Sequence, residues 1–424
     1  MAEQEEGQRA QRVATIDLLR GLAILEAILY HLWNFNSGKI YYTPSHATLI
    51  RRLGTQISEF DVPATITATT DLIFRSGADG VISWFFMMSG FWLTYGALRN
   101  NREVPALPFY LGRPLRLLRA YWVGVAIVLA FLVVFAVPKM LVDDVTFTHA
   151  VTRLGPLKYF DRSSLAASIL FVPRGFKFEW AFAIPSSFWF AFLLMQFYLL
   201  HPWFLRFGRS VGFGWLLGGS LLTSLTATTA LILVTGDFEK HAWVPALWFP
   251  FRILDHTFGM VLAYLLLTYR SKLERIATGP VAGLWMVGGL AVYLFGSASI
   301  SGDGYQPVLT YPLVAIGLAC FSLPLLIESP RRVEASLPGR ILTWIGPMSL
   351  TVIIMNEPFR FIDQYLWTQG VSRSAGWWFY IVVVYVPGTL VLAALLARFL
   401  GLTSRDHLLQ LLPRNGRRKL YQPL

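Results

Sequence analysis

The sequence has 424 residues, of which 55% are hydrophobic and only 14% are charged. Soluble domains carry roughly a quarter charged residues, so this composition excludes an ordinary soluble globular protein and indicates a chain embedded in lipid. The net charge of +12 does not indicate nucleic-acid binding, because the basic residues are dispersed between apolar runs, and the single Cys320 excludes an intramolecular disulfide or a CxxC metal pair.

The predicted elements are membrane-spanning helices, each of which needs about 20 mostly apolar residues. The polar residues 1–12 form a predicted cytoplasmic segment, and the first apolar run follows without a signal-peptide cleavage site. Ten spans are predicted near 13–36, 77–98, 115–137, 183–205, 211–235, 246–268, 279–299, 307–327, 341–361 and 375–400. Nine or eleven spans are the alternatives. The predicted fold class is therefore all-α, a polytopic helix bundle with one transmembrane domain at 13–400 and a cytoplasmic basic tail at 401–424.

The orientation of the spans follows from Lys and Arg in the short connections. These residues gather at 99–114, 206–210, 269–278 and 328–340 and in the tail, whereas the opposing short connections hold only Lys240 and Arg373. Both termini are therefore predicted to be cytoplasmic. The long connections at 37–76 and 138–182 are predicted outer loops, and loops of this length are usually functional.

The first span, IDLLRGLAILEAILYHLWNF, carries four ionisable residues: Asp17, Arg20, Glu26 and His31. An ionisable residue inside a membrane is a functional hypothesis by default. Eleven helical residues return to within roughly 20° of the starting direction, so Arg20 and His31 share one stripe about 16 Å apart, while Glu26 points elsewhere. Histidine can act as a general base near neutral pH. The alternatives are a histidine satisfied within a helix bundle and a structural i,i+3 pair of Asp17 with Arg20.

The second span and the connection after it form another candidate group. Ser89 and Gly90 permit close helix approach, and Arg113, Arg116 and Arg119 repeat every three residues. Arginine forks match phosphate oxygens, which favours a phosphate-binding site. The alternative is that these arginines only anchor the cytoplasmic end of a span.

Two later spans each contain a polar turn that is either a satisfied bundle-interior network or a substrate contact. Their residues are Arg252, Asp255 and His256 in the sixth span and Asn356, Glu357 and Arg360 in the ninth. His201, beside Pro202 at an inner boundary, is interpreted as structural.

Six segments, kept in order along nearly the whole chain, resemble the acyltransferase 3 family of membrane O-acyltransferases. DLLRGLAILEAILYH is similar to that family's opening signature, with its Arg-x10-His element at Arg20 and His31, and FFMMSGF is similar to its FFxxSGF segment. The other four segments are RPLRLLRAYW, SSFWFAFLLMQFYLLHPW, FRILDHTFGMVLAY and SLTVIIMNEPF. The sequence departs from the family's pattern at five positions: Ser83 before FF, where many relatives carry an acid, Arg119 for a Pro, Leu194 for a Glu, His256 near another Glu position, and Asn356 for a late His.

The resemblance implies a multi-pass enzyme of the bacterial cytoplasmic membrane. It would transfer an acyl group, by default acetyl, from acyl-CoA to a hydroxyl of a carbohydrate, glycolipid or small hydroxylated acceptor. The implied catalytic residues are His31, Arg20 and Asp17, with His31 acting either as general base or as acyl carrier. The implied donor-binding residues are Arg113, Arg116, Ser89 and Tyr121.

No cofactor is expected to be bound permanently. The expected partners are acyl-CoA, by default acetyl-CoA, as co-substrate, the acceptor, and membrane lipid, with neither a metal nor nucleic acid; a homodimer stays open. A transporter or flippase is one competing function, although the paired broken helices it predicts in two corresponding halves are not seen. A non-catalytic partner in polysaccharide export is the other, because Leu194 and Asn356 depart from the family pattern.

Overall fold

A computed structural model gives the fold as an all-α bundle of long helices, and the ranges it describes contain no strand. The described residues are 15–31, 54–59, 61–101, 104–143, 166–167, 169–171, 189–236, 243–298, 306–327, 336–368, 376 and 379–403. The predicted fold class is confirmed. The predicted segment at 1–12 and most of the predicted tail at 401–424 lie outside the described residues.

The described helices follow one another along the chain. A first helix occupies residues 15–31. The later long helices are α3 (Val62–Arg99), α4 (Ala106–Asp143), α8 (Trp189–Ser210), α9 (Phe213–Thr235), α11 (Phe249–Thr268), α13 (Pro280–Ala298), α14 (Thr310–Ile327), α17 (Ser349–Thr368) and α19 (Val386–Phe399). The shorter elements are α10 (Trp243–Leu247), α12 (Arg270–Ile276), η4 (Gln306–Leu309), α16 (Leu337–Ile345), η5 (Gly346–Met348) and η6 (Tyr380–Tyr385).

Among the described residues, nine stretches are long and apolar enough to cross a membrane. Each coincides with one of the last nine predicted spans. The first predicted span, 13–36, is helical at 15–31, and its remaining residues lie outside the described ranges. The chain is therefore a multi-pass helix bundle.

Three helix ends lie outside the predicted spans, because helical turns continue beyond the apolar windows. Helix α3 begins at Val62, within the predicted outer loop at 37–76, where the Asp61 carboxylate accepts a hydrogen bond from the Ala64 N–H at 3.0 Å and caps the helix. Helix α4 begins at Ala106, before the predicted span start at 115, so Arg113 lies on a helix rather than in a connection. The same helix continues to Asp143, past the predicted start of the second outer loop at 138.

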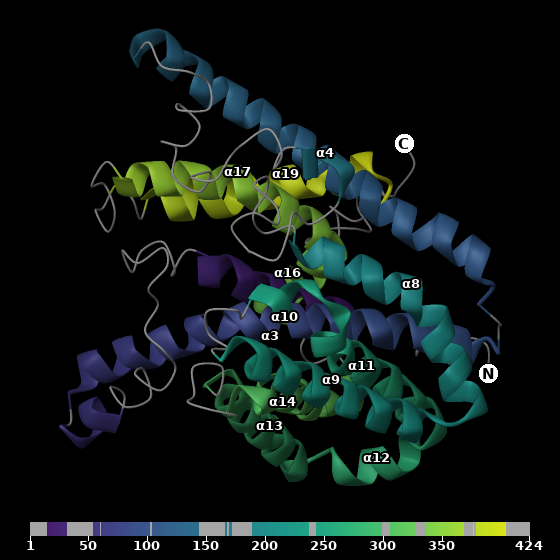
Figure 1. The fold of residues 1–424 in the computed structure, drawn as a ribbon. Helices are drawn as coiled ribbons and strands as arrows, with labels where there is room; N and C mark the ends of the chain where they lie inside the picture. The colour runs from purple at the N-terminus through teal and green to yellow at the C-terminus, as the bar shows by residue number, and fades with distance from the viewer. Residues whose placement is uncertain are drawn as a thin grey trace, which may run out of the picture.

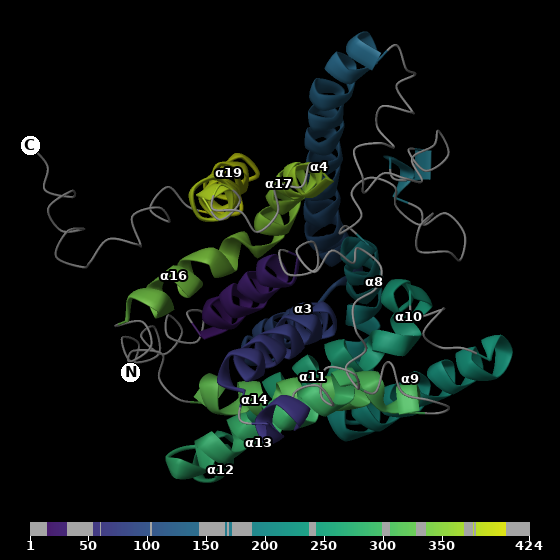
Figure 2. The ribbon, with the colours of Figure 1, turned by 90° about the vertical axis from the view of Figure 1, so that its left-hand side faces the viewer.

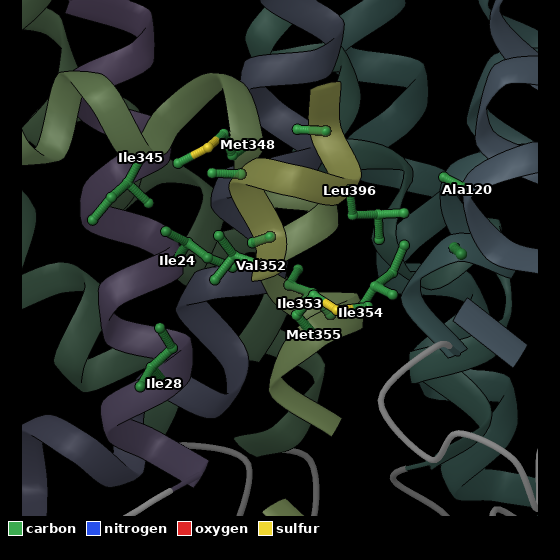
Figure 3. Packing of buried hydrophobic residues seen from close by; sticks show 14 of the residues in the cluster. Ile24, Ile28, Ala120, Ile345, Met348, Val352, Ile353, Ile354, Met355 and Leu396 are labelled. Carbon is green, nitrogen blue, oxygen red and sulfur yellow. The ribbon is translucent and has the colours of Figure 1, made fainter. Parts of the chain in front are cut away.

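The first helix lies between two groups of helices (Figures 1 and 2). Helices α4, α16, α17 and α19 lie on one side of it, and α3 with α9, α11, α13 and α14 lies on the other. Its side chains join both groups: Ile16 and Leu19 pack in a cluster with residues of α3, α11 and α14, whereas Ile24 and Ile28 pack with residues of α4, α16 and α17. Figure 3 shows Ile24 and Ile28 facing Ile345, Met348 and Val352 across this second contact.

Glycines permit the first helix to approach α16 at backbone distance. A Cβ on Gly21 would overlap the Leu342 carbonyl, and a Cβ on Gly346 would overlap the carbonyl of Asp17. The contact is reciprocal. Gly21 meets Leu342 and lies four residues after Asp17, and Gly346 meets Asp17 and lies four residues after Leu342. Small residues at such crossings are typical of membrane helices, whose association depends on close packing. This contact fixes the helix that carries Asp17 and Arg20.

Candidate active site

The first helix supplies an ion pair near its beginning. An Arg20 guanidinium nitrogen lies 3.6 Å from a carboxylate oxygen of Asp17, and the two side chains are 26% and 14% exposed. The i,i+3 spacing places both groups on neighbouring positions of the helix surface. The predicted pairing of these residues is therefore present, and Arg20 keeps part of its surface available to a ligand.

Three arginines from two helices lie near one another at this end. Arg113, half-buried on α4, interacts electrostatically with Arg20, with the exposed Arg116 and with Tyr198 of α8. None of the described carboxylates forms an ion pair with Arg113 or Arg116. Like charges close together repel unless an anion compensates them. The arrangement is therefore suited to an anion with several charges, such as a phosphate-bearing ligand.

The end of the first helix carries a chain of three hydrogen-bonded side chains. The side-chain amide nitrogen of Asn356, on α17, lies 3.0 Å from Nδ1 of His31. The Tyr385 hydroxyl donates a hydrogen bond of 2.7 Å to Oδ1 of Asn356. Asn356 is 2% exposed and Tyr385 is fully buried, whereas His31 is half-buried. The buried pair thus contacts the histidine on its Nδ1 side.

Local backbone structure sets the position of Tyr385. It ends η6, a π-helical stretch, and π-helical turns are frequent at functional sites. The Phe359 ring lies 6.0 Å from the Tyr385 ring, and the Phe359 carbonyl accepts a 2.9 Å hydrogen bond from the Tyr380 hydroxyl. The Tyr385 ring therefore packs against Phe359 of α17, whose backbone is hydrogen-bonded to Tyr380 of η6.

The two remaining predicted donor-binding residues lie in packed surroundings. Tyr121 is 1% exposed and its ring meets the Phe171 ring edge to face at 4.6 Å. Ser89 is 8% exposed on α3, next to Gly90, which contacts the His256 backbone. The described contacts do not bring either residue to the arginines, and their predicted donor-binding role stays a prediction.

The polar turn of the sixth span forms an interior network away from His31. Arg252 donates from Nε to Asp255 at 2.8 Å and from a terminal nitrogen to the Ser83 hydroxyl at 2.7 Å. Its guanidinium carbon lies 4.5 Å from the centre of the Tyr311 ring. Arg252 and Asp255 are 2% and 0% exposed. Ser83, one of the departures from the family pattern, is thus a neutral partner of Arg252. The carboxylate that pairs with Arg252 is that of Asp255, on the same helix α11.

A second buried contact joins α8 to α11. Nδ1 of His201 lies 3.1 Å from Nε2 of His256, and both residues are fully buried. The His256 ring stacks on Phe197 with centroids 4.9 Å apart, and the His201 ring stacks on Phe109 at 5.7 Å. The packing of His201 agrees with its structural interpretation from the sequence.

The sequence named Asn356 only as a member of a polar turn and as a departure from a family motif, and it did not single out Tyr385. Both positions carried a feature from which the sequence could have singled them out. The resemblance to the family pattern marks Asn356 as a departure from a late motif, and Tyr385 is a hydroxyl-bearing residue within the apolar run YIVVVYV. What the sequence lacked was the proximity of two residues 325 positions apart, His31 and Asn356.

Comparison with protein families agrees with the resemblance carried by the motifs. The acyltransferase 3 family model, described as an acyltransferase domain, matches residues 13–398, nearly the whole chain. Searches among curated proteins and among solved structures found no match.

Proposed function

Because the chain belongs to the acyltransferase 3 family, and is in general terms a membrane acyltransferase, we propose that it transfers an acyl group, by default acetyl, from cytoplasmic acyl-CoA to a hydroxyl of a carbohydrate or glycolipid acceptor. The proposal rests on two features of the first helix. Arg20 lies near Arg113 of α4, and His31 lies about 16 Å further along the first helix. An extended donor needs these two features: a cationic site for its phosphates and a base at its thioester.

The donor site of the proposal consists of Arg20, Arg113 and Arg116. Arginine forks bind phosphate oxygens in pairs, and two of these three arginines lack a described carboxylate partner. The uncharged arm of the donor would then extend along the first helix toward His31. Asp17 would hold Arg20 in place through their ion pair. The proposal places this site at the cytoplasmic side, following the excess of basic residues in the connections there.

In the proposed reaction Nε2 of His31 takes the proton of the acceptor hydroxyl as its oxygen attacks the thioester carbonyl carbon. The new C–O bond forms and the C–S bond breaks, and the leaving thiolate receives the proton from the imidazolium of His31. In a second route Nε2 attacks the carbonyl carbon first, so that an N–C bond forms, the C–S bond breaks and the thiolate leaves. The acceptor hydroxyl then attacks the acyl-imidazole, the N–C bond breaks, and the hydroxyl proton passes to the thiolate. Both routes need a lone pair on Nε2.

The test uses purified protein in detergent with acetyl-CoA as the probe and water as the acyl acceptor, and follows the release of free thiol. Wild-type protein should cleave the thioester. His31→Ala should lower the rate by about 10²–10⁴-fold, the range for loss of a general base, while calorimetry with CoA gives an unchanged affinity. Radiolabel from the acetyl group that stays on wild-type protein but not on His31→Ala favours the acyl-imidazole route. Comparable thioester cleavage by both proteins would refute the assignment of His31.

A further inference from the structure

The contact between Asn356 and His31 determines which ring nitrogen of the histidine carries the proton. In the arrangement of the structure, Oδ1 of Asn356 accepts from the Tyr385 hydroxyl, so the amide N–H₂ faces Nδ1 of His31. An amide nitrogen has no lone pair to offer, hence Nδ1 is the acceptor. Neutral imidazole carries one proton, which therefore resides on Nε2. In this state Nε2 can donate a hydrogen bond but can neither accept a proton nor attack a carbonyl.

After a half-turn of the Asn356 amide, the other tautomer of His31 fits the amide without loss of a hydrogen bond. The exchange of tautomers passes through the imidazolium: Nδ1 takes up one proton from water and Nε2 releases one proton to water. Oδ1 then faces Nδ1, which becomes the donor, and the amide N–H₂ donates to the oxygen of Tyr385. A tyrosine hydroxyl can donate or accept, so it satisfies either orientation. Both Asn356 and Tyr385 are buried, and a buried amide whose partner is lost is strongly disfavoured. His31 and Tyr385 therefore allow two orientations of the Asn356 side-chain amide, related by a half-turn, and disfavour the orientations between them.

We propose that Asn356, held by Tyr385, is a positioning residue that selects the tautomer of His31, the arrangement in the structure being the resting one and the rotated amide the reactive one. The inference rests on the proposed role of His31 and applies to both routes, since each needs the lone pair on Nε2. An amide can orient an imidazole through Nδ1 in this way without itself touching the substrate.

The variants of the test separate the hydrogen-bonding role of Asn356 from its volume. Asn356→Leu keeps a similar shape and removes both hydrogen bonds. Asn356→Asp offers His31 only acceptor oxygens, which fixes the proton on Nδ1, and still accepts from the Tyr385 hydroxyl. Tyr385→Phe removes the group that holds the amide. Thr351→Val is the matched control: Thr351 is a buried polar residue of the same helix whose hydroxyl bonds only to the Met348 carbonyl at 2.9 Å among the described contacts.

The first readout is thiol release from acetyl-CoA, with kcat and KM measured separately. Asn356→Leu should lower kcat by about 10²-fold or more at unchanged KM, because no oxygen then accepts from Nδ1–H when Nε2 takes up a proton, and Tyr385→Phe should lower kcat by about tenfold. Asn356→Asp should raise kcat above that of the wild type, because it holds the reactive tautomer throughout, and Thr351→Val should stay within about fivefold of wild type. If His31→Ala is inactive but Asn356→Leu keeps wild-type kcat, the inference is wrong and the proposed function stands.

The second readout does not depend on activity. Nitrogen NMR of protein labelled at its seven histidines distinguishes the two tautomers, and the signals missing from His31→Ala are those of His31. The Nε2–H form should dominate in wild type and the Nδ1–H form in Asn356→Asp, whereas Asn356→Leu should give a mixture. Equal tautomer populations in wild type and Asn356→Leu would overturn the inference, even if acetyl-CoA proves not to be a substrate.

Discussion

The side-chain amide of Asn356 lies 3.0 Å from Nδ1 of His31, joining the end of the first helix to the middle of α17. The contact brings two segments from opposite ends of the chain to one site. It also supports the histidine ring at Nδ1, and the predictions below follow from that contact and from the packing of the helix that carries the histidine.

The polar residues of the first helix should contribute to activity in a fixed order. Arg20→Ala should lower acetyl-CoA cleavage through loss of donor positioning, and Asp17→Asn should have a milder effect, because Asp17 acts through its ion pair with Arg20. Glu26→Gln is the control, since Glu26 lies roughly 120–140° around the helix from Arg20 and His31. The measurement is thiol release by the three purified variants. A larger loss in Glu26→Gln than in Arg20→Ala would contradict the assignment of the catalytic face.

Donor affinity should depend on the arginines of α4. Arg113→Ala and Arg116→Ala should each raise the dissociation constant of CoA about 10- to 100-fold, because charge-assisted hydrogen bonds contribute about 1.5–3 kcal/mol. The effect of Arg113 should be the larger, since it is half-buried and Arg116 is exposed. Lysine at either position should restore affinity only in part, because it lacks the planar fork.

Calorimetry with CoA checks the predicted affinities, and Arg206→Ala is the control, an exposed arginine on α8 that the sequence predicts to lie at the same membrane side. If Arg206→Ala weakens CoA binding as much as Arg113→Ala does, the effect is one of general charge and the arginine site is wrong.

The backbone contact of the first helix with α16 should be intolerant of a methyl group. Gly346→Ala would force its Cβ into the Asp17 carbonyl, and overpacking of this kind costs about 1–3 kcal/mol. We expect a lower thermal transition in detergent together with weaker CoA binding, because the contact fixes Asp17 and Arg20. Gly218→Ala on α9, where no atom lies within 4 Å of the added Cβ, should leave both unchanged. If both variants have the same thermal transition, the methyl group added at Gly346 costs no stability and the prediction is wrong.

The Arg252–Asp255 pair should matter for stability more than for donor binding. Arg252→Met leaves the Asp255 carboxylate buried without its cation, and breaking a buried pair in this way costs about 3–5 kcal/mol. Replacing both residues, as Arg252→Met with Asp255→Leu, should restore much of the thermal stability because no charge is then left unpaired. A double variant that is less stable than Arg252→Met would mean that the pair stabilises the bundle through more than mutual neutralisation.

The predicted orientation can be checked by labelling in a Cys320-free background. A cysteine introduced at Asn101, in the turn after α3, should react with a membrane-impermeant thiol reagent only from the cytoplasmic side, because the adjoining connection is rich in arginine. If the reagent modifies this cysteine from the outer side of sealed cells, the predicted orientation is wrong, and so is the side from which acyl-CoA is proposed to enter.

The sequence by itself determined the fold class, the approximate spans and the helix that bears the candidate catalytic residues. Long apolar runs predict membrane helices reliably, since every backbone polar group must be satisfied within lipid. Helical periodicity likewise placed Arg20 and His31 on one stripe, because spacing within a helix is a local property. Hydropathy failed at the start of α3, where a capped but polar helical turn has no apolar window to mark it.

Only the tertiary structure decided which polar residues meet. Ser83 and Asp255 share Arg252, whereas Asn356 contacts His31 and Tyr385, although both polar turns had the same two interpretations before their contacts were known. The difference depends on the crossing of helices far apart in the chain, which reciprocal glycines and side-chain packing set jointly. No periodicity within one helix encodes the partner that a buried side chain will find on another.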